Sequence, residues 1–268
     1  MARNRVLVRP VVALSAGLLS LTGCAGTTSG IAADAVSPTA AQGPVVVATT
    51  VWEAALAKAA GAKDVRYLVP ATVKHAPDYD LKPTDLTAVK GADFVLYASF
   101  EPFAGRVRDA AGSKAEMIEV NLDDDRDNTT AQVTMLGKAF GTEQTAARWN
   151  TAFTAEFDEL SQQLKGEWPG GRPPVVVTQT FTTWVAEMVG VQPVGTYGPD
   201  AVTPVQLAQL SAKKPQFVFD NENMSTGTVL PDSGARQLDI VNYPGADLDL
   251  LTVYRDAAAQ LTKEFAGS

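Results

Sequence analysis

The sequence predicts an α/β fold of two lobes with mainly parallel sheets, joined by one long linking helix. Short apolar runs typical of buried strands alternate with helical segments along most of the chain. The alternation is interrupted once, over residues 142–166, where only a helical periodicity is present. After this interruption strands and helices alternate again. Two α/β lobes on either side of one helix are the simplest fold with this order.

The first predicted lobe covers residues 44–141 and the second covers residues 172–268. Strands are expected at 44–50, 65–69, 93–99, 116–120, 174–180 and 216–220. Helices are expected at 51–61, 101–112, 184–190, 203–215 and 247–265. Such alternation favours parallel strands joined by right-handed crossovers. A ligand site is then expected in a crevice between the lobes, at the carboxyl ends of the strands.

The linking helix is predicted from one stripe of apolar side chains. Trp149, Phe153, Phe157, Leu160 and Leu164 follow one another at steps of four, four, three and four residues. This spacing places them on one face of a helix of about six turns. The sequence "GEWPGGRPP" then ends the helix, because Pro and Gly both disfavour its continuation.

The first 23 residues have the pattern of a secretory signal peptide. Arg3, Arg5 and Arg9 precede an apolar run over residues 11–21, which is too short to span a membrane. The sequence "LTGCAG" places Cys24 where processing is expected and resembles the lipobox of bacterial lipoproteins. The resemblance implies that Cys24 carries lipid and holds an extracytoplasmic protein at the cell membrane. Residues 24–43, which lack aromatic side chains, are expected to form a flexible tether.

The acidic charge argues against two kinds of partner, nucleic acid and anionic lipid, and the cysteine count excludes a disulfide within the chain. The chain has 22 basic and 30 acidic residues, and removal of the signal peptide leaves 19 basic ones and a net charge of −11. So acidic a surface argues against direct binding of nucleic acid or anionic lipid. With a single cysteine, no disulfide forms within the chain.

The only histidine lies in "LVPATVKHAPDYDLKPTDL", residues 68–86, a stretch too rich in proline for a helix interior. Three roles are open for His75: a metal ligand, a catalytic base and an ordinary loop residue. A Ser–His–Asp hydrolase would have to use it, but the chain has no Gly-x-Ser-x-Gly motif. We therefore do not expect an enzyme.

Three segments together resemble the metal-binding solute-binding proteins of ABC transporters that import zinc or manganese. They are "HAPDYDLKPTDL" (75–86), "GADFVLYASFEPFAGRVRDAAG" (91–112) and "FDNENMS" (219–225). The first is two residues longer before the tyrosine than the pattern of that family. The resemblance implies a monomeric, lipid-anchored binding protein that hands its cargo to an ABC permease. It implies Zn²⁺ or Mn²⁺ as the cargo and no organic cofactor.

The resemblance also implies the positions of the metal ligands, two from each lobe. They fall on His75, Asp123, Gln179 and Asn242, and only the first keeps the residue type usual in the family. Carbonyl oxygens of Gln and Asn are weak ligands for zinc. The altered set leaves a second function open: the same scaffold binding a metal chelate or a small organic solute. A secreted hydrolase is a distant third.

Other residues near the implied site have alternative roles. The alternating acids Asp123, Asp125 and Asp127 resemble the start of a calcium-binding loop. Asn128 and Thr134, however, stand where that loop needs Gly and Glu. The alternative there is a solvated turn that caps the next helix through Asp127 or Asn128.

Three further residues are candidates for the surroundings of the site. Glu101 is expected either beside the site or in the first turn of a helix, where the helix dipole favours an acid. Trp52 and Trp184 follow strand ends, where they either line the cleft or pack in the core.

The lipid anchor gives a first prediction. Replacing Cys24 by Ala removes the only side chain that can be lipidated at the processing site. We expect the variant to move from the membrane fraction into the soluble extracytoplasmic fraction, as followed by fractionation and immunoblotting. Membrane association equal to that of the parent protein would contradict the lipoprotein interpretation.

Overall fold

The structure, a computed structural model, describes residues 43–73 and 75–267. The predicted signal peptide, Cys24 and nearly all of the tether therefore lie outside the described residues. Within the described ranges no helix has the length and apolar character needed to cross a membrane.

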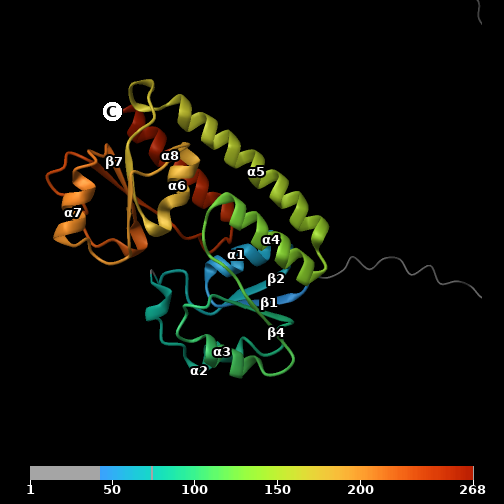
Figure 1. Cartoon of the computed structure of the whole chain (residues 1–268). Helices are drawn as coiled ribbons and strands as arrows, with labels where there is room; N and C mark the ends of the chain where they lie inside the picture. The colour runs from blue at the N-terminus through green and yellow to red at the C-terminus, as the bar shows by residue number, and fades with distance from the viewer. Residues whose placement is uncertain (1–42, 74, 268) are drawn as a thin grey trace, which may run out of the picture. The chain divides into compact units, whose positions relative to one another are not determined.

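The first lobe contains a four-stranded parallel sheet of order β2-β1-β3-β4 (Figure 1). Its strands are β1 (Val45–Ala48), β2 (Asp64–Tyr67), β3 (Phe94–Tyr97) and β4 (Glu116–Glu119). Its helices are α1 (Val51–Ala59), α2 (Pro83–Thr87), α3 (Ala104–Ala111) and α4 (Arg126–Phe140). All four predicted strands are present, each shortened by one to three residues.

The second lobe repeats this arrangement with the strand order β6-β5-β7-β8, again all parallel. Its strands are β5 (Val176–Gln179), β6 (Gly195–Tyr197), β7 (Phe217–Asn221) and β8 (Arg236–Ile240). Its helices are α6 (Thr183–Val189), α7 (Pro204–Ser211) and α8 (Leu250–Ala266). Neither β6 nor β8 falls in an expected strand range, and β6 has only three residues, too few to show an alternating pattern. The predicted α/β fold with two mainly parallel sheets is confirmed.

Both sheets reverse their strand order at the same place. The first strand of each lobe has the second strand on one side and the third strand on the other. The reversal points therefore lie between β1 and β3 and between β5 and β7. In doubly wound sheets ligands bind at such points, beyond the carboxyl ends of the strands.

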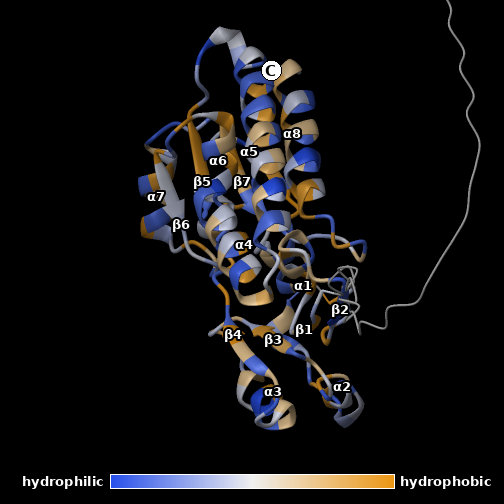
Figure 2. Cartoon of the chain, turned by 90° about the vertical axis from the view of Figure 1, so that its right-hand side faces the viewer, coloured by the Kyte–Doolittle hydropathy of each residue, from blue (hydrophilic) through white to orange (hydrophobic). Residues whose placement is uncertain are grey.

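The predicted linking helix is α5 (Glu143–Gly166), which packs against α4 of the first lobe and α6 and α8 of the second (Figure 1). Phe153, Phe157 and Leu164 of the predicted stripe are buried, and Trp149 and Leu160 are half-buried. Figure 2 shows hydrophilic residues, in blue, alternating with less polar ones along this helix.

Helices α4 and α5 approach each other closely because the contact contains small side chains. A Cβ atom at Gly137 of α4 would lie 2.4 Å from the Cβ of Ala146 on α5. Gly141 has a left-handed backbone with φ of 66° and ends α4, so the chain turns directly into α5. This turn ties the linking helix to the first lobe.

Tyr254 of α8 connects the linking helix to both lobes. Its ring packs edge-on against Phe153 and Trp184, each with ring centroids 5.0 Å away. Its hydroxyl donates to the carbonyl oxygen of Asp124 at 2.9 Å and lies 3.1 Å from the hydroxyl of Thr129. One buried side chain of the second lobe thus contacts α5 and also bonds to the start of α4 in the first lobe.

The aromatic contacts of Phe153 give a second prediction. Replacing this fully buried residue by Ala leaves a cavity between Trp149 and Tyr254. We expect the free energy of unfolding to fall by about 3–5 kcal/mol, measured by chemical denaturation. As a control on the same helix, replacing the exposed Glu159 by Ala should change it by less than about 0.5 kcal/mol. Equal effects in the two variants would show that α5 does not hold the lobes together.

Candidate functional site

Three carboxyl groups are buried at the carboxyl ends of the strands of the first lobe. Glu53 lies in the first turn of α1, directly after β1, Glu101 follows β3, and Asp124 follows β4. Their exposed fractions are 0%, 4% and 5%. Acids are rarely so deeply buried unless they are paired or serve a function.

Glu53 is held in place by the N-terminus of α1. Its Oε2 accepts a hydrogen bond from the Thr50 backbone N–H at 3.0 Å and another from the Thr50 hydroxyl, which closes a capping box. Its Oε1 is buried without a hydrogen-bond partner. Burial raises the pKa of this carboxyl group, although the bonds from Thr50 act in the opposite direction.

Glu101 lies beside Glu53 and has a similar arrangement. Its Oε2 accepts a hydrogen bond from the Ala98 backbone N–H at 3.0 Å, and its Oε1 has no partner. Burial, followed by the negative charge of Glu53, raises its pKa to about 8. The alternative expectation that Glu101 caps a helix is wrong. Helix α3 has Phe103 at its N-cap, because the Glu101 carboxyl is bonded back toward the end of β3.

Asp124 is the third buried acid, and it faces the second lobe. Burial raises its pKa well above the usual range, and a hydrogen bond from Asn242 lowers it in part. Its Oδ1 has no hydrogen-bond partner at good geometry. No lysine or arginine among residues 43–73 and 75–267 forms a salt bridge with any of the three acids.

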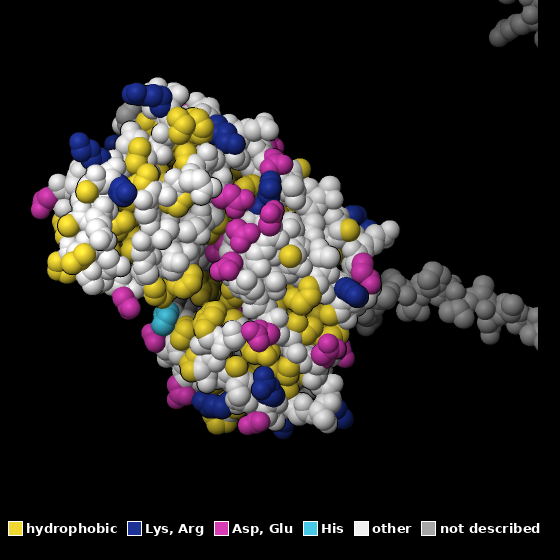
Figure 3. All heavy atoms as spheres, in the orientation of Figure 1, with side chains coloured by type: hydrophobic (Ala, Val, Ile, Leu, Met, Phe, Trp, Pro, Cys, Tyr) yellow, Lys and Arg dark blue, Asp and Glu magenta, His cyan; other side chains and the backbone are white. Residues whose placement is uncertain are grey.

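Tyr243 of the second lobe faces all three acids. Burial raises the pKa of its hydroxyl, and the charges of Glu53, Asp124 and Glu101 raise it further, in that order. Its ring packs edge-on against Trp52 of α1, with centroids 5.9 Å apart. The acids and the two rings therefore occupy the region where the lobes meet. Figure 3 shows the surface hollowed between the lobes, with the single histidine, in cyan, at the rim.

The predicted ligand His75 lies at the edge of this region. It precedes a 3-10 turn, Ala76–Asp78, and its Nδ1 lies 2.9 Å from Oδ2 of Asp78 on that turn. Its side chain is 40% exposed, and the predicted ligand Asp123 is also exposed. Across the described part of the chain, no three or more His, Cys, Asp or Glu side chains are grouped closely enough to hold a metal ion.

The other two predicted ligands, Gln179 and Asn242, are buried. Gln179 follows the reversal point of the second sheet, and its Oε1 accepts a hydrogen bond from the Phe181 backbone N–H at 2.6 Å. Its Nε2, a donor, has no partner. Asn242 Oδ1 accepts a hydrogen bond from Trp184 Nε1 at 2.8 Å. Both amide oxygens already have a partner within the second lobe.

The remaining predicted residues have structural contacts. Asp125 is the N-cap of α4 and accepts a hydrogen bond from the Asn128 backbone N–H at 2.8 Å. The expected helix cap is therefore present, but Asp125 provides it rather than Asp127 or Asn128. Trp52 and Trp184 are both buried, at 3% and 2% exposure, and each touches a residue of the site, Tyr243 or Asn242.

Sequence reasoning missed Glu53, Asp124 and Tyr243. The spacing Thr50-x-x-Glu53 is a capping-box signal, which predicts a helix start but no buried acid. Asp124 is the middle residue of three consecutive aspartates, and only the packed structure distinguishes it from its exposed neighbour Asp123.

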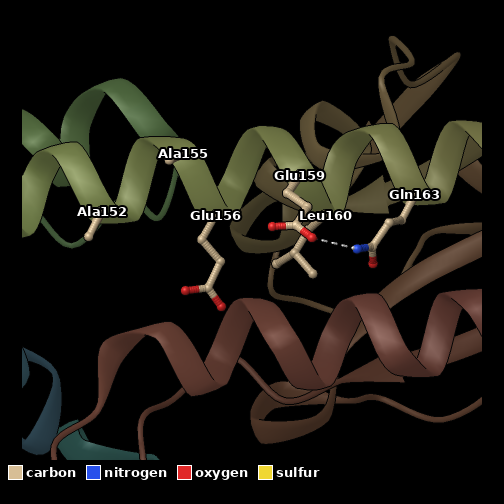
Figure 4. A pocket seen from close by; sticks show the side chains of 6 residues that line it. All are labelled: Ala152, Ala155, Glu156, Glu159, Leu160 and Gln163. Carbon is tan, nitrogen blue, oxygen red and sulfur yellow. Dashed lines mark hydrogen bonds between the residues drawn. The ribbon is translucent and has the colours of Figure 1, made fainter. Parts of the chain in front are cut away.

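Two hollows lie on the surface of the second half of the chain. One, of about 450 Å³, follows α5 beside α8 and is lined by Ala152, Ala155, Glu156, Glu159, Leu160 and Gln163 (Figure 4). In it Glu156 forms a salt bridge with Arg255, and none of the buried acids reaches it. The other, of about 300 Å³, lies at the loop after β8 and is walled by Tyr243.

Comparison with solved structures identifies the fold. The laminin-binding protein Lmb of Streptococcus agalactiae, described as bifunctional with adhesin and metal-transporting activity, is 18% identical, with a TM-score of 0.61 over 83% of this chain and 98% of that one. The solute-binding protein FpvC of Pseudomonas aeruginosa in complex with Mn²⁺ is 17% identical, with a TM-score of 0.61 over 82% and 96%. This chain has the fold of the metal-binding solute-binding proteins.

A third solved structure agrees with the other two. A ZnuA deletion mutant with zinc bound is 17% identical, with a TM-score of 0.59 over 82% of this chain and 96% of that one. The first two structures are described as binding proteins, and the second and third hold a divalent metal. No protein-family model matches the sequence, and no curated protein matches it. The likeness is therefore one of structure, at low sequence identity.

The raised pKa of Glu101 gives a third prediction. In the folded protein this carboxyl keeps its proton up to about pH 8, whereas in the unfolded chain it loses it near 4.5. Between these values the folded state binds more protons, so the free energy of unfolding should fall as the pH rises. The slope from one group is at most ~1.4 kcal/mol per pH unit.

Urea unfolding of chelator-treated protein between pH 4.5 and 8.5 measures this slope. We expect Glu101→Gln to make it shallower but not zero, because Glu53 remains and also has a raised pKa. The exposed Glu119, changed to Gln, is the matched control and should keep the slope of the parent protein. A parental slope in Glu101→Gln would show that this carboxyl does not keep its proton.

Proposed function

We propose that this protein is a lipid-anchored, extracytoplasmic solute-binding protein that delivers a divalent metal ion, Zn²⁺ or Mn²⁺, to an ABC importer. One observation carries the proposal: Glu53, Glu101 and Asp124 are buried where the lobes meet, on a scaffold that holds metal ions in similar proteins. No basic side chain of the described residues neutralises them.

The energetics of burial support a positively charged ligand. An ionised carboxylate is costly to bury without a partner, so such a group takes up a proton or binds a cation. Three of the four buried acids of the described residues, Glu53, Glu101 and Asp124, lie around Tyr243. A divalent cation entering it would compensate two negative charges at once.

The four-residue ligand set implied by the resemblance stays a prediction. Gln179 and Asn242 would supply buried amide groups from the second lobe, and His75 and Asp123 would have to move inward from the surface. Such movement is compatible with a hinged two-lobe protein, in which closure around the ligand signals loading to the permease. The lipid on Cys24 would keep the monomeric protein close to that permease.

A second candidate function keeps the scaffold and changes the cargo. The free Nε2 donor of Gln179 and the Trp52–Tyr243 ring pair favour a metal chelate or a small organic solute that carries oxygen acceptors. Aromatic side chains and a few fixed polar groups are typical of such sites.

Metal analysis tests the leading candidate and gives a fourth prediction. Protein purified without chelator should contain about one divalent metal ion per chain, measured by inductively coupled plasma mass spectrometry. After metal removal, isothermal titration with Zn²⁺ and Mn²⁺ should give a saturable heat with the same stoichiometry. Absence of both bound metal and titration heat would rule out the leading candidate and favour the chelate or organic solute.

A further inference from the structure

We propose that the cargo ion is bound by the carboxyl groups of Glu53 and Glu101 together with the hydroxyl of Thr49, and that it is a hard, oxygen-preferring divalent cation of the Mn²⁺ class. This inference rests on the proposed function and makes its site and its cargo specific. It replaces His75 as the principal ligand by a cluster within the first lobe.

The topology places all three groups at one point. Thr49 and Glu53 follow the end of β1, and Glu101 follows the end of β3, the two strands between which the order of the first sheet reverses. This is the position at which doubly wound sheets bind their ligands. The Thr49 backbone N–H donates to the carbonyl oxygen of Leu96 at 3.0 Å, which joins the two strand ends directly.

Each of the three side chains has an unused oxygen. Thr49 Oγ1, Glu53 Oε1 and Glu101 Oε1 are buried, and none has a hydrogen-bond partner. The Thr49 hydroxyl lies near enough to both carboxyl groups to affect each of them, although at no hydrogen-bonding geometry. Thr49 is 0% exposed, so solvent does not satisfy its hydroxyl. The buried, unsatisfied hydroxyl of Thr49 therefore indicates a missing ligand on its own account, in addition to the buried acids.

The other oxygen of each carboxyl group is fixed by the main chain. Glu53 Oε2 is bonded to the Thr50 N–H and Glu101 Oε2 to the Ala98 N–H, both at 3.0 Å. The two side chains are therefore oriented before an ion arrives, and little conformational entropy is lost on binding. The free oxygens are the ones left for a ligand.

The donor types select the class of ion. Two carboxylates and a hydroxyl offer oxygen alone, whereas zinc prefers nitrogen and sulfur donors in a tetrahedral site. Hard divalent ions with higher coordination numbers accept one or two carboxylates and complete their shell with water. The lack of any group of three metal-binding side chains in the described ranges is compatible with such a partly hydrated site.

Tyr243 gives the site a link to the second lobe. Its ring packs on Trp52, next to Glu53 in the sequence, and walls the hollow at the loop after β8. Movement of the second lobe would shift Tyr243 relative to the three ligands. Binding at this site and the relative position of the lobes would then be coupled, as solute delivery requires.

The test uses metal-free full-length protein and Mn²⁺ as the probe, with free Mn²⁺ followed by electron paramagnetic resonance and binding heat by calorimetry. We expect Glu53→Gln and Glu101→Gln each to weaken Mn²⁺ binding by at least about tenfold. Gln retains the capping box at position 53, so the fold should be preserved. Glu119→Gln, the exposed control, should bind Mn²⁺ like the parent protein. The parent protein should bind Mn²⁺ in preference to Mg²⁺.

The outcomes separate this inference from the proposed function. If the parent protein binds metal, both Gln variants bind it equally well and His75→Ala abolishes binding, the inference is overturned and the function stands. If the parent protein binds no metal, both the inference and the proposed function are overturned. If either Gln variant does not fold, as judged by circular dichroism, Thr49→Val decides, since it removes only the hydroxyl. Parental affinity in Thr49→Val would then overturn the inference.

Discussion

The packing of Tyr254 between the linking helix and the two lobes is the contact on which the rest of the structure depends. Its ring fills the space between Phe153 and Trp184, and its hydroxyl bonds to the backbone of Asp124. The same bond fixes the loop that carries the buried carboxyl of Asp124. The hydrophobic contact and the position of one acid of the candidate site are therefore set by one side chain.

The site itself is governed by the cost of burying charge. Glu53 and Glu101 are each held by a backbone N–H through one oxygen and left unpaired through the other, and Oδ1 of Asp124 is also unpaired. Such an arrangement is stable as long as protons or a cation compensate the charge. Three buried carboxyl groups that can bind either protons or a cation therefore lie at the point where the two lobes meet.

Much of the fold was predictable because its signals are local. Apolar runs predicted the strands, and the stripe that includes Phe153 and Phe157 predicted α5, since the period of a helix is visible in the sequence itself. Helix α4 is less apparent, because its contact with α5 uses Gly137 and Ala146, small residues that contribute little to a hydrophobic pattern. The predicted site was less complete, since Glu101 and Asn242 lie in the buried region whereas His75 lies at its rim.

The sequence by itself determined the two parallel lobes, the long helix and the acidic character of the chain, because these follow from periodicity and composition. Only the tertiary structure decided which acids matter. Glu53 and Glu101 are 48 residues apart and meet because β1 and β3 are neighbours in the sheet. Asp123 and Asp124 are identical in type and adjacent in sequence, yet one is exposed and the other is buried. Burial and long-range proximity, which set the charge and affinity of such groups, arise from packing and leave no local pattern.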